Sequence, residues 1–239
     1  MTASGSLQDI VPPLAARKSL AEEAAEVLRE MILLEKIAPG MPVNERELAS
    51  ALGISRTPLR EAVRLLEADG LIEYSPTRRP FIANPDIEQV AQALSVLGAL
   101  EALAGEQACQ KASAAEIARI AAIAGRVSRV SEAGAAPLDF FRLDMEFHQT
   151  IVAASGNQPL IATHRQYNAR LWRSRFISSR RMLDRPRTLR EHDQVLQALL
   201  DRDGPACATA LRRHLESTVA NIRTALAATI TGPDGTGRG

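Results

Sequence analysis

The stretch Asn44–Gly70, which reads NERELASALGISRTPLREAVRLLEADG, decides the fold of the N-terminal part of this chain. Apolar residues recur at helical spacing on both sides of Gly53, a residue suited to the left-handed conformation that ends a helix. Ser55 and Thr57 are candidate caps for the second helix, and Pro58 fits its first turn, where a missing N–H costs little. Two short helices joined by a tight turn predict a helix-turn-helix.

The exposed side of the second predicted helix carries the side chains that could contact DNA bases. Arg56 and Arg60 are four residues apart and lie off the apolar stripe, with Ser55 and Thr57 beside them at the helix start. The planar fork of an arginine can bond guanine O6 and N7 together. Arg46 on the preceding helix is placed to reach the same groove or the phosphates. The alternative is a solvated helix face in an all-α protein.

A hairpin is predicted directly after these helices. Residues 71–74 and 81–83 are two short β-rich runs around the polar loop SPTRRP. A two-stranded ribbon in this place is a wing. Arg78 and Arg79 at its tip are expected to contact phosphates or the minor groove.

The residues 39–72, PGMPVNERELASALGISRTPLREAVRLLEADGLI, resemble the winged-helix signature of GntR-type transcription regulators. The resemblance implies DNA contacts from one set of polar side chains: mainly Arg46, Arg56 and Arg60, supported by Ser55 and Thr57. The chain departs from the family at Arg79-Pro80, close to which a wing-tip glycine is usual.

Composition bounds the class of protein. The 239 residues, with 46% hydrophobic and 3% aromatic residues, allow one large or two ordinary domains and favour helix over sheet. The formal net charge is only +1, and residues 1–83 carry ten Lys/Arg against twelve Asp/Glu. This acidic balance is unusual for a DNA-binding domain. Affinity for double-stranded DNA is therefore expected to need locally placed arginines and a homodimer on an inverted-repeat operator.

Neither a secreted nor a membrane protein is indicated. Cys109 and Cys207 are isolated, without the spacing of a zinc knuckle or a disulfide framework. The first residues lack a signal-peptide pattern, and no apolar run of about eighteen residues occurs. A soluble, cytoplasmic protein without a membrane partner is expected.

The rest of the chain predicts helices. Beyond residue 85 we expect six, at about 86–110, 114–132, 138–155, 159–182, 187–202 and 205–229. The expected segments are a flexible arm over 1–15, a winged helix-turn-helix domain over 16–84, a helical effector-binding and dimerisation domain over 85–230, and a disordered tail over 231–239. The fold class is mainly α, a winged helix-turn-helix followed by an antiparallel all-α bundle of about six helices.

Four residues of this bundle could form a metal site. Asp144 and His148 are four apart on one predicted helix and project from the same face, among apolar neighbours. His192 and His214 lie in the last two predicted helices. One carboxylate and three imidazoles that meet inside a bundle can bind a divalent metal. The alternative is a set of ordinary core or surface histidines.

Three segments strengthen the metal hypothesis: DMEFHQTIVAASGNQPL (144–160), EHDQVLQALLDRD (191–203) and RRHLES (212–217). They resemble the effector-binding helical domain, called FCD, of the FadR subfamily of GntR regulators. In metal-containing members an Asp and three His bind the metal, which implies this role for Asp144, His148, His192 and His214. His164 lies outside the pattern. Zinc is the default for such ligands, and nickel or manganese is compatible.

The resemblance also implies a small organic or sugar acid as effector, bound directly at the metal. Many members hold the effector with an arginine four residues before the position of Glu101, where this chain has Leu97. Nine arginines between residues 165 and 190 could replace it. Arg175 falls on the apolar stripe of its predicted helix and is the candidate effector-binding residue.

Three functions remain open from the sequence. The first is a sequence-specific transcription regulator, by family a repressor relieved by its effector. The second is a direct metal-ion sensor. The third is a metal-dependent hydrolase, since an open metal site can activate water. No spare acid or histidine in a matching motif serves as a general base, so we do not predict an enzyme.

Overall fold

The computed structural model describes residues 18–179 and 185–230, with side chains through Thr224. The arm predicted over 1–15, the end of the helix predicted over 159–182 and the tail predicted over 231–239 lie outside the described residues. The described elements of the N-terminal half are α2 (Leu20–Leu33), α3 (Glu45–Leu52), α4 (Arg56–Ala68), β1 (Ile72–Tyr74) and β2 (Pro80–Ile82). Those of the C-terminal half are α5 (Ile87–Lys111), α6 (Ala114–Glu132), α7 (Pro137–Ala154), α8 (Gln158–Ser179), α9 (Arg185–Leu200) and α10 (Gly204–Ile230).

The predicted helix-turn-helix is confirmed. α3 ends at Gly53, whose φ of 67° is the left-handed conformation expected from the sequence. The apolar side of α4, with Leu59, Val63 and Leu66, is buried against α2 and α3. The capping role expected of Thr57 is wrong, because α4 already begins at Arg56. Ser55 is the N-cap residue, yet its side chain makes no capping hydrogen bond.

The wing forms without a tip glycine. β1 and β2 pair antiparallel, with Tyr74 opposite Pro80. Arg78 takes the left-handed conformation of the turn, with a φ of 56°. Ser75 holds this turn, because its hydroxyl accepts a hydrogen bond from the Arg79 N–H at 3.1 Å and its own N–H donates to the Arg79 carbonyl at 2.9 Å. Local hydrogen bonds thus stabilise a conformation that arginine rarely adopts.

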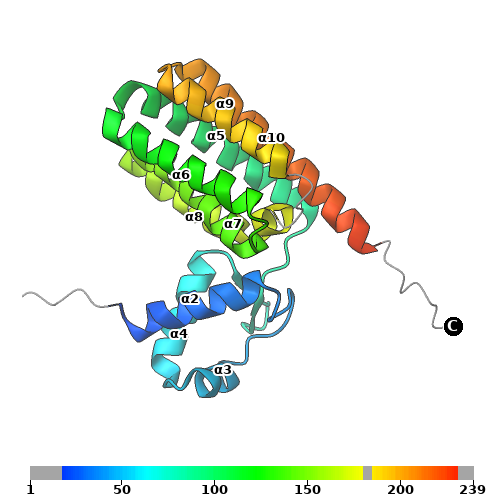
Figure 1. Ribbon diagram of the computed structural model, residues 1–239. Helices are drawn as coiled ribbons and strands as arrows, with labels where there is room; N and C mark the ends of the chain where they lie inside the picture. Colours follow the sequence, from blue (N-terminus) through cyan, green and yellow to red (C-terminus); the bar gives the residue numbers. More distant parts are fainter. Residues whose placement is uncertain (1–17, 180–184, 231–239) are drawn as a thin grey trace, which may run out of the picture.

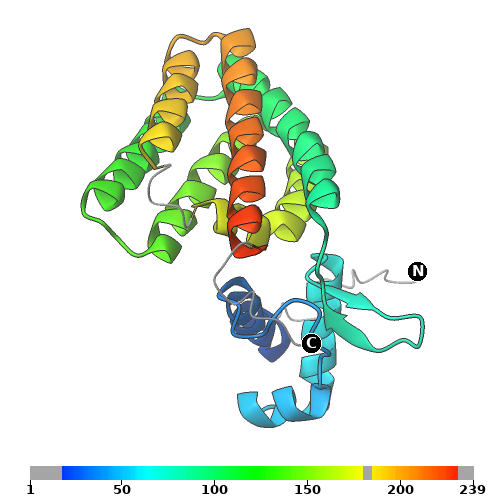
Figure 2. The same cartoon turned by 90° about the vertical axis from the view of Figure 1, so that its right-hand side faces the viewer.

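The C-terminal half is the predicted antiparallel helical bundle, seen in the upper part of Figure 1. Capping boxes start two of its helices, with Asp86 and Gln89 at α5 and with Ser113 and Glu116 at α6. α5 packs against α7, α8, α9 and α10. In Figure 2 the bundle stands over the helix-turn-helix, and the wing projects to one side.

Among the described residues one helix, α5, is long and apolar enough to cross a membrane by length and composition alone. Its apolar character has a local explanation, because α5 packs against four other helices of the bundle. In its middle it carries Glu101, a buried carboxylate with three partners. These contacts are typical of a core helix in a bundle.

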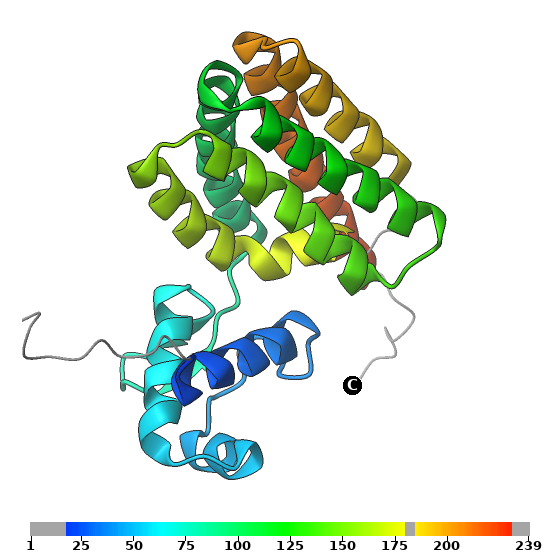
Figure 3. The same ribbon diagram turned by 60° about the vertical axis from the view of Figure 1, so that its left-hand side comes forward.

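α2 connects the two halves of the molecule. Its Leu33 is buried in a cluster with Phe141 and Met145 of α7 and Phe176 of α8. The Phe141 ring meets Phe176 edge-on, with centroids 5.3 Å apart. α2 therefore lies between the bundle and α3, as Figure 3 shows.

Two ion pairs flank this apolar contact. Arg142 of α7 donates to Glu30 of α2 at 2.8 Å, and Arg173 of α8 donates to Glu35 at 2.7 Å. Because exposed pairs of this kind contribute about 0.2–1 kcal/mol each, the apolar cluster provides most of the contact energy.

Candidate DNA-binding surface and candidate metal centre

The residues expected to contact DNA all lie on the surface. α3 and the start of α4 form the end of the molecule remote from the bundle (Figure 1). The exposed side chains there and on the wing include every predicted contact: Arg46, Ser55, Arg56, Thr57, Arg60, Arg78 and Arg79. The Ser55 hydroxyl is not used for capping, so it remains available to a phosphate.

Arg60 has a partner that the sequence analysis missed. Its Nε donates to the Glu45 carboxylate at 3.0 Å, which ties α4 to the first turn of α3. The Arg60 side chain is 59% exposed, so solvent screens this pair strongly. The pair can therefore open at little energetic cost.

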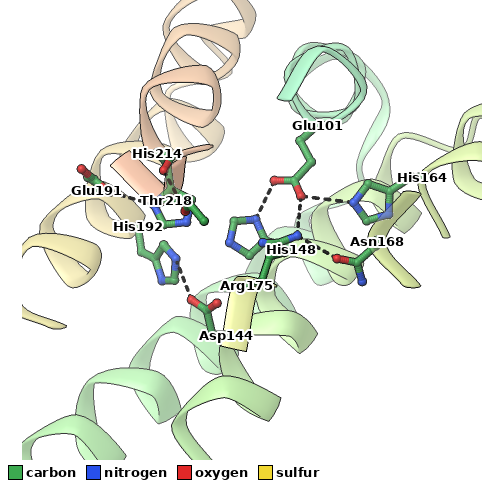
Figure 4. A network of polar contacts seen from close by, with 10 residues as sticks. All are labelled: Glu101, Asp144, His148, His164, Asn168, Arg175, Glu191, His192, His214 and Thr218. Carbon is green, nitrogen blue, oxygen red and sulfur yellow. Dashed lines mark hydrogen bonds and ion pairs between the residues drawn. The ribbon is translucent and has the colours of Figure 1, made fainter. Parts of the chain in front are cut away.

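The four predicted metal ligands meet in the interior of the bundle. Asp144 and His148 come from α7, His192 from α9 and His214 from α10 (Figure 4). All four are buried, and one ligand atom from each lies within 4.8 Å of the others. Residues up to seventy positions apart in sequence thus converge on one point.

Two carboxylates orient two of these histidines. The Glu101 Oε2 lies 2.7 Å from Nδ1 of His148, and the Glu191 Oε2 lies 2.8 Å from Nδ1 of His214. The two imidazole rings stack, with centroids 4.9 Å apart. Because each Nδ1 is engaged by a carboxylate, the Nε2 atoms are the ones free to bind a metal.

The other two ligands face each other. Nε2 of His192 lies 3.3 Å from Oδ1 of Asp144, and the His192 ring stacks on Phe147 at 4.3 Å. Several buried polar atoms of the cluster make no hydrogen bond: Asp144 Oδ1, His148 Nε2, and both ring nitrogens of His192. Buried polar atoms are normally satisfied. A divalent cation fits this donor set, because it would bind the Asp144 carboxylate, Nε2 of His148 and one ring nitrogen of His192 together.

Burial and nearby charges keep three of the candidate ligands, Asp144, His148 and His192, in the protonation state that a metal needs. Burial lowers the pKa of His148 to about 4, and burial also lowers the pKa of His192. Burial alone would raise the pKa of Asp144, yet its contact with His192 and the nearby His148 hold that pKa well below its usual value. Neutral imidazoles beside an ionised carboxylate are the form that binds divalent metals.

Sequence reasoning missed the residues that support the ligands. The buried Glu101 contacts His148, His164 at 3.2 Å and Arg175 at 3.1 Å, so the unassigned His164 belongs to this network. A signal for Glu101 was present, because it is the one charged residue between Val90 and Gly105 of an apolar helix. Glu191, which directly precedes His192, offered no comparable signal.

A small pocket opens beside the cluster. Its wall includes Asp144, His214 and Arg175, and its cavity of about 20 Å³ has room for one water-sized group. Arg175 donates to Glu101 at 3.1 Å and to the Asn168 side chain at 2.8 Å. Leu97 is completely buried on α5. Arg175 is buried and lies in the pocket wall, so its side chain points inward as the sequence predicted.

Comparisons with known proteins identify both halves. The family of bacterial regulatory proteins named gntR matches residues 20–82, and the FCD domain matches residues 92–217. An uncharacterized HTH-type transcriptional regulator in an unstable DNA locus of Streptomyces ambofaciens is 31% identical over 82% of this chain and 81% of its own length. The HTH-type transcriptional repressor RspR of Escherichia coli K12 is 27% identical over 84% of this chain and 88% of its own length.

Solved structures share the fold. Escherichia coli McbR/YncC matches with a TM-score of 0.75 at 18% identity, over 87% of this chain and 99% of that one. A GntR transcriptional regulator from Rhodococcus sp. RHA1 matches with a TM-score of 0.68 at 19% identity, over 85% of this chain and 97% of that one. The chain therefore belongs to the GntR family and, with its FCD domain, to the FadR subfamily: it is a DNA-binding transcription regulator and not an enzyme.

Proposed function

We propose that this regulator is a repressor whose affinity for its operator depends on a divalent metal and a small carboxylate effector in the FCD domain. The observation that carries the proposal is the cluster of Asp144, His148, His192 and His214, buried, with ligand atoms within 4.8 Å of one another. Three imidazoles and one carboxylate suit zinc, and nickel or manganese is compatible. The relative RspR is named a repressor, which supports repression rather than activation as the proposed effect on transcription.

On the DNA side, two copies of the chain bind the two halves of an inverted repeat. Specific contacts come from the start of α4 and from α3, and the wing holds the phosphates. The proposed contacts are Arg46, Ser55, Arg56, Thr57, Arg60, Arg78 and Arg79. All seven are exposed, which supports this assignment: those on α3 and α4 lie at the end of the molecule remote from the bundle, and Arg78 and Arg79 lie on the wing that projects to one side. A homodimer compensates for the acidic balance of residues 1–83.

In the FCD domain, the metal would act as a Lewis acid that holds an effector carboxylate at its open coordination position. Arg175 lines the same pocket and supports the effector with its guanidinium. We propose domain boundaries of 16–84 for the winged helix-turn-helix and 85–230 for the helical domain. Residues 1–15 and 231–239 flank them as arm and tail.

The signal would pass through α7 and α8. Both helices line the pocket and also contact Leu33 of α2, so a shift of either helix moves the DNA-binding half. An effector that binds one arrangement of these helices better than another shifts the population between states of different operator affinity.

The test is elemental analysis of purified protein beside the double variant Asp144→Ala, His148→Ala. We expect about one metal ion per chain in the wild type and none in the double variant. His164→Gln is the matched control, because this buried histidine contacts Glu101 and lies outside the cluster. Equal metal content in the wild type and the double variant would refute the metal site.

A second candidate function is a direct metal-ion sensor, which the same cluster favours. Its test is operator binding measured against added zinc with no organic acid present. Affinity that follows zinc alone would make the ion the signal. Affinity that changes only when an organic acid is added would support the effector-responsive regulator.

A further inference from the structure

Arg185, the first residue of α9, is a buried cation without an acidic partner. Only 3% of its surface is exposed, and it forms no ion pair with any acid in the described part of the chain. Both of its Nη atoms donate to the same acceptor, the Ala135 carbonyl, at 3.2 Å. Its Nε is buried and makes no hydrogen bond.

Arg175 has the kind of acidic partner that Arg185 lacks among the described residues. The two guanidinium groups line the same pocket, yet Arg175 is neutralised by Glu101 at 3.1 Å. Within residues 18–179 and 185–230, Arg185 contacts a carbonyl and the face of the Phe140 ring, whose centroid lies 4.6 Å from its Cζ. The attraction of a cation to a ring face is weaker than the cost of burying an unpaired charge.

The place of Arg185 indicates what would neutralise it. Asp144 and His214 of the metal cluster line the pocket together with Arg185. A metal in that cluster would add positive charge to a pocket whose wall already holds the Arg185 guanidinium, and the two carboxylates of this wall are engaged elsewhere, Asp144 by His192 and Glu191 by His214. An anionic ligand would neutralise both the metal and the Arg185 guanidinium. A carboxylate suits the planar guanidinium, because the guanidinium can donate two parallel hydrogen bonds to it.

We propose that Arg185 anchors a second anionic group of the effector, so that the effector class is a diacid bound at one end by the metal and at the other by Arg185. This inference rests on the proposed metal site. The present cavity of about 20 Å³ is too small for such a molecule. Binding therefore requires that Arg185 leave the Ala135 carbonyl and that the pocket widen around the ligand.

Zinc-loaded full-length protein can be titrated calorimetrically, at constant ionic strength, with three diacids and with the monoacids of the same carbon number. The pairs are malonate with propionate, succinate with butyrate, and glutarate with pentanoate. We expect the wild type to bind at least one diacid about ten-fold more tightly than its monoacid, equivalent to about 1.4 kcal/mol. In Arg185→Gln the preference should fall to about two-fold or less.

Arg190→Gln is the matched control, because it removes the same charge from an exposed position on the same helix. It should keep the wild-type preference. If Arg185→Gln does not fold, Arg185→Lys is the deciding variant, because it retains the charge and loses the planar guanidinium. For Arg185→Lys we expect about five-fold weaker diacid binding, with monoacid binding unchanged. No diacid preference in the wild type, or an equal preference in the Arg185 variants, overturns the proposal.

Metal content measured in the same samples separates this outcome from the proposed function. A wild type that holds zinc and lacks a diacid preference refutes the role of Arg185 alone. A wild type that takes up no zinc at this cluster refutes the metal site and, with it, the inference that depends on the site.

Discussion

Asp144 and Met145 are neighbours on α7 and belong to two different side-chain clusters. Asp144 belongs to the buried cluster of candidate metal ligands, whereas Met145 packs with Leu33 of α2 in the cluster between the two halves. α8 repeats the arrangement, because Arg175 lines the pocket and the adjacent Phe176 contacts the Leu33 cluster. Each helix thus joins the pocket to the DNA-binding half through adjacent residues.

The first prediction concerns this coupling. Leu33→Ala removes the α2 side chain from the cluster and should cost about 2–5 kcal/mol in the free energy of unfolding, as for other buried Leu→Ala changes. In calorimetry, zinc should raise the unfolding temperature of both halves of the wild type. In the variant it should raise only that of the bundle. A zinc response of the DNA-binding half equal to that of the wild type would argue against coupling through Leu33.

The second prediction concerns base recognition by α4. Arg60→Ala should weaken operator binding by about 1–3 kcal/mol, the usual loss for one bidentate base contact. Binding to random DNA should change much less, as measured by titration on both sequences at one salt concentration. Arg64→Ala is the control, since Arg64 is exposed on the same helix and pairs with Glu61 at 2.9 Å. Equal losses on both DNAs would make Arg60 a phosphate contact.

The third prediction tests the ion pair between Arg60 and Glu45. Glu45→Gln removes an acid beside the proposed docking surface and frees Arg60 from its partner. The free energy of unfolding should change by less than about 1 kcal/mol, because the Arg60 side chain of the pair is 59% exposed and solvent screens the charges. Operator affinity at low salt should rise. Unchanged or weaker binding would mean that Glu45 positions Arg60 rather than competing with DNA.

The fourth prediction concerns the carboxylate behind His148. Glu101→Gln replaces the anion that lies 2.7 Å from Nδ1 of His148 and should lower zinc affinity about 10–100-fold, as for other supporting residues of metal sites. Zinc competition with a chromogenic chelator measures the change. His164→Gln, which alters the same network without touching His148, should keep affinity within a few-fold. A larger loss in His164→Gln than in Glu101→Gln would contradict this role of Glu101.

Local signals predicted most of the fold. The capping boxes at Asp86 and Ser113 and the left-handed Gly53 act within three or four residues, so they can be recognised along the chain without tertiary information. The same holds for Asp144 and His148, whose spacing places them on one face of α7. The wing turn was less predictable, because no glycine occupies it. Arg78 adopts the positive φ instead, and hydrogen bonds between Ser75 and Arg79 stabilise the turn.

The sequence by itself determined which segments become helices, which faces are apolar, and which residues could bind DNA or a metal. Only the tertiary structure decided which charges find partners. Arg175 is neutralised by Glu101, which lies seventy-four positions away on another helix, whereas Arg185, ten residues further on, pairs with no acid among the residues that the structure describes. The physical reason is that caps and helical periodicity arise from neighbours in sequence, whereas burial and charge pairing depend on how helices pack across the whole domain.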